Sequence, residues 1–187
     1  MKVYVTGAHA CGKSTLTRYI SEKYRLPMLP EAARMILSEQ ELQIDSLRCN
    51  LEISNKFSQQ VFDRQLLQEK QFDSFVSDRT ALDVLAYSAE HDQILPLLMA
   101  RPDISEYINK LILPDSFIFF IRPSKTTMKQ DGVRESLTWE GMLAIDSHIK
   151  FILNMYKLRF FQINTDNMQE RIGLIDSILL PNNVGNI

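Results

Sequence analysis

The fold of this chain is decided by the stretch Gly7-Ala8-His9-Ala10-Cys11-Gly12-Lys13-Ser14. It fits the pattern G-x-x-x-x-G-K-[ST] in full, and Thr15 follows it. Glycines let the backbone curl so that consecutive N–H groups point at a phosphate, and the next helix presents its positive N-terminal end to the same anion. The lysine reaches the β- and γ-phosphates, and the serine hydroxyl binds Mg²⁺. We therefore predict a nucleoside triphosphate site at residues 7–15, with Lys13 as a catalytic cation and Ser14 as a metal ligand.

The residues on either side of this phosphate loop have the pattern of a strand and a helix. Residues 2–6 are short, β-branched and aromatic, which predicts a buried strand. Residues 13–24 place apolar side chains at helical spacing, and Pro27 follows as a stop. A strand before the loop and a helix after it are the context that the motif requires. His9 and Cys11 lack partners at metal-ligand spacing, so we expect them to serve mainly as backbone positions of the loop.

Strands and helices alternate along the rest of the chain. Strands are predicted at residues 28–29, 74–78, 117–121 and 160–163, and helices at 31–40, 50–72, 80–90, 93–113 (interrupted by two prolines), 139–158 and 168–180. This alternation predicts an α/β fold, in which helices cover both faces of a parallel sheet. We expect a single domain over residues 1–180 and a tail at 181–187.

Composition limits the class of protein further. The 187 residues are 45% hydrophobic and 24% charged, which is typical of a globular chain and excludes a collagen-like or coiled-coil protein. The net charge of −2 argues against an extended binder of nucleic-acid backbone. Two cysteines are too few for a disulfide scaffold, and no apolar run approaches the roughly 20 residues of a membrane span. With no secretory signal pattern at the start, we expect a soluble, cytoplasmic protein with no membrane partner.

A phosphate loop can serve a switch, a motor or a phosphotransferase. A guanine-nucleotide switch needs an Asn-Lys-x-Asp element near the fifth strand, but the chain has Asn164-Thr165-Asp166-Asn167 there. A motor ATPase usually ends an apolar strand in Asp-Glu, and here the strand ends in Asp78-Arg79. A small kinase remains as the best interpretation.

Three more elements accompany the phosphate loop in order along the chain. They are Pro30-Glu31-Ala32-Ala33-Arg34, Ser77-Asp78-Arg79-Thr80 with Leu82-Asp83 and Ala86-Tyr87, and Asp131-Gly132-Val133-Arg134. With these elements the chain resembles the P-loop kinase group that includes the nicotinamide riboside kinase domain and the thymidylate and deoxynucleoside kinases. The resemblance implies a P-loop NTPase fold, with a five-stranded parallel sheet in the order 2-3-1-4-5 and a lid loop at about residues 122–138. It also implies an ATP- and Mg²⁺-dependent phosphotransferase.

The resemblance assigns roles to the residues at the ends of two strands. Glu31 would face the acceptor hydroxyl, where a carboxylate accepts the hydroxyl proton or helps to place Mg²⁺, and Arg34 would help bind the acceptor. Asp78 would hold the Mg²⁺ shell or the acceptor, and Arg79 would project towards the acceptor or its phosphate. The alternatives are a helix-start charge for Glu31 and an ordinary strand-end ion pair for Asp78 and Arg79. Asp83, one helical turn further on, can be simply a surface charge.

The segment 122–134 combines basic residues with the absence of an apolar stripe. Cations that close on the transferred phosphoryl group contribute most to this chemistry. Arg134 is our first choice for a lid residue and Arg122 the second, with Gly132 as a hinge. The alternative is a solvated basic loop.

Three functions follow, in order of preference. The first is transfer of phosphate from ATP to a nucleoside, a nucleotide or a related small metabolite. The second is a kinase that acts on nucleic acid, at a 5′ end or on a hydroxylated base. The third is an ATP-binding regulatory module without useful transfer activity. The sequence leaves open the identity of the acceptor, the choice between ATP and GTP, and the oligomeric state.

Overall fold

A five-stranded sheet forms the centre of the molecule in the computed structural model, which describes residues 1–42, 47, 50–125 and 138–182. The strands are β1 (Lys2–Thr6), β2 (Met28–Leu29), β3 (Phe75–Asp78), β4 (Ser116–Ile121) and β5 (Phe161–Ile163). They lie in the order β2-β3-β1-β4-β5, and every neighbouring pair is parallel. The expected order 2-3-1-4-5 is therefore confirmed.

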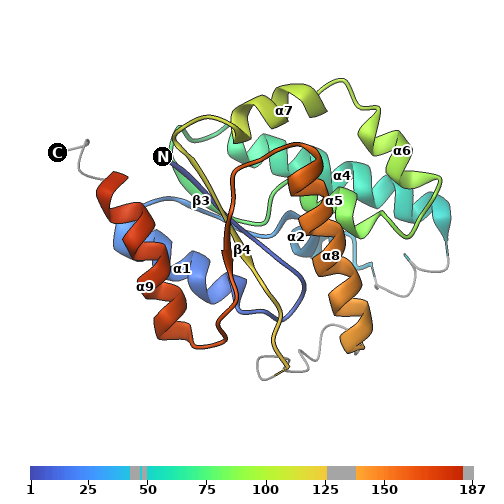
Figure 1. The fold of residues 1–187 in the computed structure, drawn as a ribbon. Coiled ribbons are helices and arrows are strands. Elements are labelled where there is room, and N and C mark those ends of the chain that lie inside the picture. Colours follow the sequence, from blue (N-terminus) through green and yellow to red (C-terminus); the bar gives the residue numbers. More distant parts are fainter. Residues whose placement is uncertain (43–46, 48–49, 126–137, 183–187) are drawn as a thin grey trace.

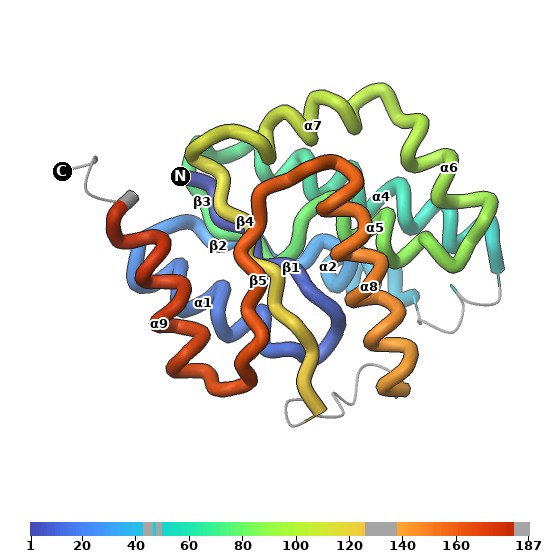
Figure 2. Tube along the Cα trace, in the orientation of Figure 1, coloured from blue at the N-terminus to red at the C-terminus, as the bar shows by residue number. Residues whose placement is uncertain are grey.

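Alternation along the strands divides the core into two layers. In β1, Val3 and Val5 pack on one face of the sheet and Tyr4 packs on the other. In β4, Phe119 follows the first face and Phe120 the second. Successive side chains of a strand point to opposite faces, and both faces of a parallel sheet are covered, so these strands are apolar at nearly every position. The sheet crosses the middle of the molecule between two helical layers (Figure 2).

The helices are distributed unequally over the two faces (Figure 1). One face is covered by α1 (Lys13–Tyr24) and α9 (Met168–Leu179), and a short 3-10 turn (Leu180–Asn182) follows α9. The other face is covered by α2 (Ala32–Glu39), α4 (Leu51–Glu69), α5 (Leu82–Tyr87), α6 (Ile94–Met99), α7 (Ile104–Leu111) and α8 (Trp139–Met155). Helices on both faces were expected from the alternating pattern.

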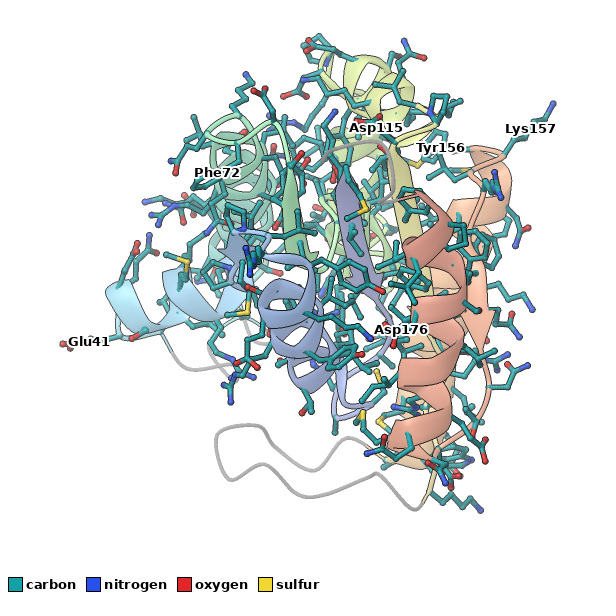
Figure 3. The ribbon with its side chains drawn as sticks, turned by 90° about the vertical axis from the view of Figure 1, so that its left-hand side faces the viewer. Glu41, Phe72, Asp115, Tyr156, Lys157 and Asp176 are labelled. Atoms are coloured by element: carbon teal, nitrogen blue, oxygen red, sulfur yellow. The ribbon has the colours of Figure 1, made fainter. Side chains whose placement is uncertain are left out.

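A polar contact joins the two helices of the thinner layer. Asp176 lies on the side of α9 that faces α1, as Figure 3 shows. Its carboxylate accepts hydrogen bonds from the hydroxyls of Tyr19 and Tyr24, each at 2.8 Å, and forms an ion pair with Lys23 at 2.6 Å. These bonds fix α9 against the helix that begins at the phosphate loop.

Turn and capping residues set the boundaries of the helices. Asn50, Thr138 and Asn167 accept backbone N–H bonds at the starts of α4, α8 and α9, which satisfies donors that have no partner within a helix. The helical stretch expected at 93–113 is divided at Pro102 into α6 and α7, because proline lacks the N–H that a continuing helix needs. No helix among the described residues is long and apolar enough to cross a membrane.

Candidate active site

The phosphate loop joins β1 to α1 through two glycines in conformations that other residues avoid. Gly7 has a φ of 148° and Gly12 a φ of 84°. A Cβ atom at Gly7 would lie 2.4 Å from the carbonyl oxygen of Ile121, so a side chain there would collide with β4. The motif's first glycine is therefore required by close packing as well as by backbone conformation.

Lys13 is the first residue of α1, and its side chain is buried within the loop. Its Nζ donates to the carbonyl oxygen of Ala8 at 2.5 Å and lies 3.7 Å from the Sγ of Cys11. The ammonium group is thus held against the loop that a phosphate would occupy. In phosphate loops the lysine of this motif reaches the β- and γ-phosphates.

Ser14 and Asp78 meet at the end of β3, as a Mg²⁺ site requires. The Ser14 hydroxyl donates to Asp78 Oδ2 at 2.6 Å. The other carboxylate oxygen, Oδ1, is buried and has no hydrogen-bond partner among the described residues. A buried polar atom without a partner is unfavourable unless a ligand satisfies it. Mg²⁺ is typically held by one or two protein oxygens together with substrate phosphates and water, so this pair fits the ion. The described residues contain no cluster of three or more metal-binding side chains.

Arg79 links the end of β2 to the phosphate loop. It is buried, its backbone φ is 89°, and its Nε donates to Glu31 Oε1 at 2.8 Å. Its Nη1 donates to the Gly7 carbonyl at 3.0 Å and lies 3.2 Å from Asp83 Oδ2. The side chain therefore forms ion pairs with Glu31 and Asp83. It is not simply the partner of Asp78 in an ion pair at the end of β3.

Asp83 is not a surface charge, and that alternative was wrong. Its carboxylate is buried and accepts bonds from the hydroxyls of Thr6 and Thr80, both at 2.8 Å, besides its contact with Arg79. It stands at the start of α5, where the helix dipole favours a negative charge. Two carboxylates thus bind Arg79 at different nitrogens, which fixes the direction of its guanidinium group.

A cleft of about 260 Å³ opens beside this cluster. It lies among α2, α4, α5 and α8, with Glu31, Arg79 and Asp83 at its polar part. Phe57 and Val61 of α4 contribute apolar walls. An apolar cleft with a few convergent charged groups is the usual form of a small-molecule site.

Gln65 lines the cleft and is fixed by hydrogen bonds on its other side. Its Nε2 donates to Glu69 Oε1 and to Ser77 Oγ, each at 2.8 Å. The Ser77 hydroxyl itself donates to the Arg79 carbonyl at 2.8 Å, so its oxygen can only accept from Gln65. Both amide hydrogens are consequently used. No described residue donates a hydrogen bond to the side-chain oxygen of Gln65, so this lining residue could accept one from a molecule in the cleft.

Glu69 anchors this network below the cleft. It accepts hydrogen bonds from the hydroxyls of Tyr4, at 3.0 Å, and Tyr107, at 2.8 Å, as well as from Gln65. Burial raises the pKa of Glu69 although these donors oppose the rise. Neither Gln65 nor Glu69 was identified from the sequence. The available signal was that several polar residues fall on the buried side of α4, namely Ser54, Ser58, Gln65 and Gln68.

The remaining predicted residues have different surroundings. Arg34 is exposed, with its Nε 3.7 Å from Glu31 Oε2. Arg122 is paired with the buried Asp146, Nε to Oδ2 at 2.8 Å. Arg134 and most of the expected lid lie outside the described residues. His9 packs its ring against Tyr87 with centroids 4.8 Å apart, so it also faces the cleft.

The parallel sheet, the phosphate loop and the Ser14–Asp78 pair together define a P-loop protein with the strand order of nucleotide kinases. The family model described as an AAA domain matches residues 2–171, and the chain belongs to this family. Among curated proteins, no sequence match is found.

Solved structures with the same fold include several kinases. Deoxyadenosine kinase from M. mycoides, with the products dCMP and a flexible dCDP bound, is 18% identical; the match covers 97% of this chain and 99% of that one, with a TM-score of 0.71. Shikimate kinase from Acinetobacter baumannii, in complex with shikimate, is 12% identical and covers 96% and 93%, with a TM-score of 0.60. The NadR protein, in complex with NAD and AMP-PNP, is 16% identical and covers 94% and 48%, with a TM-score of 0.68. They confirm the expected fold.

Proposed function

We propose that this protein is an ATP- and Mg²⁺-dependent phosphotransferase that acts on a hydroxyl of a nucleoside, a nucleotide or a related small metabolite. One observation carries the proposal: Arg79 bonds both to the Gly7 carbonyl of the phosphate loop and to Glu31 in the cleft. The donor loop and the acceptor-side carboxylate therefore belong to one site. A module that only binds ATP has no need for such a carboxylate.

The phosphate side of the site holds ATP. The loop's N–H groups and Lys13 would bind the β- and γ-phosphates, and Ser14 and Asp78 would hold Mg²⁺. When bound, the ion neutralises charge on these phosphates. Lys13 lies against the Ala8 carbonyl, so phosphate oxygens would replace that carbonyl as its partner.

The acceptor side of the site removes a proton. Glu31 would accept the proton of the acceptor hydroxyl through a carboxylate oxygen. The acceptor oxygen then forms a bond to the γ-phosphorus, while the bond from that phosphorus to the β–γ bridging oxygen breaks and its electron pair leaves with ADP. Arg79 orients Glu31 through the Nε bond. Arg134, outside the described residues, is retained as the proposed lid arginine.

The nature of the cleft supports a small acceptor. Its volume of about 260 Å³ lies at the small end of ligand sites, and its apolar walls suit a ring. The relatives named above bind dCMP, shikimate and NAD. A nucleoside or a metabolite of similar size is therefore the class of acceptor that we propose.

An ATP-consumption panel with nucleosides, nucleotides, shikimate-like polyols and oligonucleotides tests the proposal. We expect turnover with at least one small hydroxyl compound. Turnover with oligonucleotides alone would support the nucleic-acid alternative. Tight ATP binding without any turnover would support the regulatory module.

A further inference from the structure

Arg171 of α9 lies behind the phosphate loop and was not singled out from the sequence. Its side chain is fully buried, at 0% exposure. Its Nη1 donates to the Cys11 carbonyl at 2.5 Å, and its Nε donates to the Thr165 carbonyl at 2.7 Å. It therefore ties the phosphate loop to the segment between β5 and α9.

The charge of Arg171 is only partly compensated. Among the described residues no carboxylate lies close enough to form an ion pair with it; Asp166 accepts a bond from Ser124 and attracts Arg171 only from a longer distance. Its Nη2 is buried and has no hydrogen-bond partner in the part of the chain that the structure describes. Burial lowers the pKa of Arg171, although the negative charge of Asp166 opposes the shift. Burying an arginine in these surroundings costs free energy, which its two carbonyl bonds offset in part.

An anion bound at the phosphate loop would give this charge a further partner. A Cβ atom at Gly12 would lie 3.2 Å from Arg171 Nη1, so the guanidinium group is in contact with the loop itself. Inside a protein, a charge acts over such short separations with much less screening than in water. A triphosphate bound in the loop would add negative charge near this guanidinium group.

We propose that Arg171 is a positioning residue of the nucleoside triphosphate site, which fixes the Cys11 carbonyl and strengthens anion binding through a charge that has no direct ion pair among the described residues. The inference rests on the proposed function, since it needs a triphosphate at the loop. The same charge that is unfavourable in the free protein becomes favourable in the complex. Arg171 thus couples folding stability to nucleotide binding.

Three variants separate the effect of the charge from the effect of the hydrogen-bond donors. Arg171→Met removes both, Arg171→Gln keeps a hydrogen-bond donor without charge, and Arg171→Lys keeps the charge. Arg159→Met is the matched control, because Arg159 is exposed and its guanidinium lies over the Phe161 ring at 5.2 Å. For each variant, calorimetry gives the dissociation constant of Mg-ATP, and thermal unfolding is followed with and without ATP.

We expect Arg171→Met and Arg171→Gln to weaken ATP binding by roughly 10- to 100-fold, the size expected when one partly screened charge near an anion is lost. Arg171→Lys should stay within about threefold of the wild type, since the charge remains. Without ATP, Arg171→Met should unfold at a temperature no lower than the Arg159→Met control, and ATP should raise that temperature less than in the wild type.

Unchanged ATP affinity in the Gln variant, or a Lys variant as weak as the Gln variant, would overturn the inference. If the Met variant does not fold, the Gln and Lys pair decides the question. A wild-type protein that binds no ATP would instead refute the proposed function, and this inference with it. The two failures are therefore distinguishable.

Discussion

Arg79 Nε and Glu31 Oε1 lie 2.8 Å apart, although one residue follows β3 and the other follows β2. Both side chains are buried, and the pair stands at the polar part of the cleft. Because Arg79 also bonds to the Gly7 carbonyl, the pair fixes the acceptor side of the site relative to the phosphate loop. In the proposed reaction, the position of the acceptor relative to the γ-phosphate depends on the pair of Arg79 and Glu31.

Glu31→Gln tests the role of the acceptor-side carboxylate. The amide keeps a hydrogen-bond acceptor for Arg79 but cannot take a proton, so turnover should fall by about 10²- to 10⁴-fold. The dissociation constant for ATP should change little. Glu39→Gln is the control, because Glu39 forms an exposed pair with Arg64. Equal turnover of the Glu31 variant and the control at saturating substrates would show that Glu31 is not the base.

Arg79→Met tests how much the same cluster contributes to the free energy of unfolding. The substitution leaves the buried carboxylates of Glu31 and Asp83 without their cation, which costs about 3–5 kcal/mol of unfolding free energy. Arg64→Met breaks an exposed pair and should cost about 1 kcal/mol or less. Urea unfolding of both variants measures the difference. Equal losses of unfolding free energy in the two variants would contradict the buried pairing of Arg79 with Glu31 and Asp83.

Asp78→Asn tests the proposed metal site. The amide keeps a partner for the Ser14 hydroxyl but presents a weaker ligand to Mg²⁺, so the Mg²⁺ concentration at half-maximal turnover should rise by about tenfold or more. Asp63→Asn, on the exposed side of α4, serves as the control. An unchanged Mg²⁺ titration would place the metal elsewhere.

Glu69 predicts a pH dependence of stability with a definite sign. Burial raises its pKa in the folded protein above the ordinary 4.5, so the folded state holds the proton over a range where the unfolded state has lost it. Its contribution to stability is complete below about 4.5 and is lost as the pH rises through the folded value. The stability of the wild type relative to Glu69→Gln should therefore fall as the pH rises above about 4.5.

Glu106 is the control for Glu69, because its pKa is shifted in the opposite direction. An exposed hydrogen bond from Lys110 lowers the pKa of Glu106, so the contribution of Glu106 is present above its ordinary pKa and is lost as the pH falls. Denaturant unfolding of Glu69→Gln and Glu106→Gln across this range distinguishes the two. A flat difference for Glu69→Gln would mean that its carboxyl group is not perturbed.

The elements nearest the phosphate loop were predictable because local signals determine them. Residues 2–6 and 13–24 form β1 and α1 with the expected bounds, since a β-branched run and a regular apolar spacing are properties of neighbouring residues. Lys13, Ser14 and Asp78 likewise follow from a motif and a strand end. Their meeting in one site follows from the topology of a parallel sheet.

Residues whose role depends on distant partners were not predictable in the same way. Asp83 is buried only because Thr6 and Arg79 supply donors from other elements. Arg122 turns to Asp146 on α8, which no local pattern indicates. Arg171 did leave a signal: it stands three or four residues from Met168 and Ile175, on the apolar stripe of α9. An arginine on such a stripe indicates a buried charge.

The most direct test of the proposed activity is transfer of labelled γ-phosphate from ATP to the acceptor panel by the wild type and by Lys13→Ala. Lys13 contacts the loop and not the core, so the variant should keep the circular dichroism spectrum of the wild type. The proposed function predicts a labelled small-molecule product with the wild type and a loss of about 10²-fold or more with Lys13→Ala. No labelled product from any acceptor, or undiminished transfer by a folded Lys13→Ala variant, would contradict it.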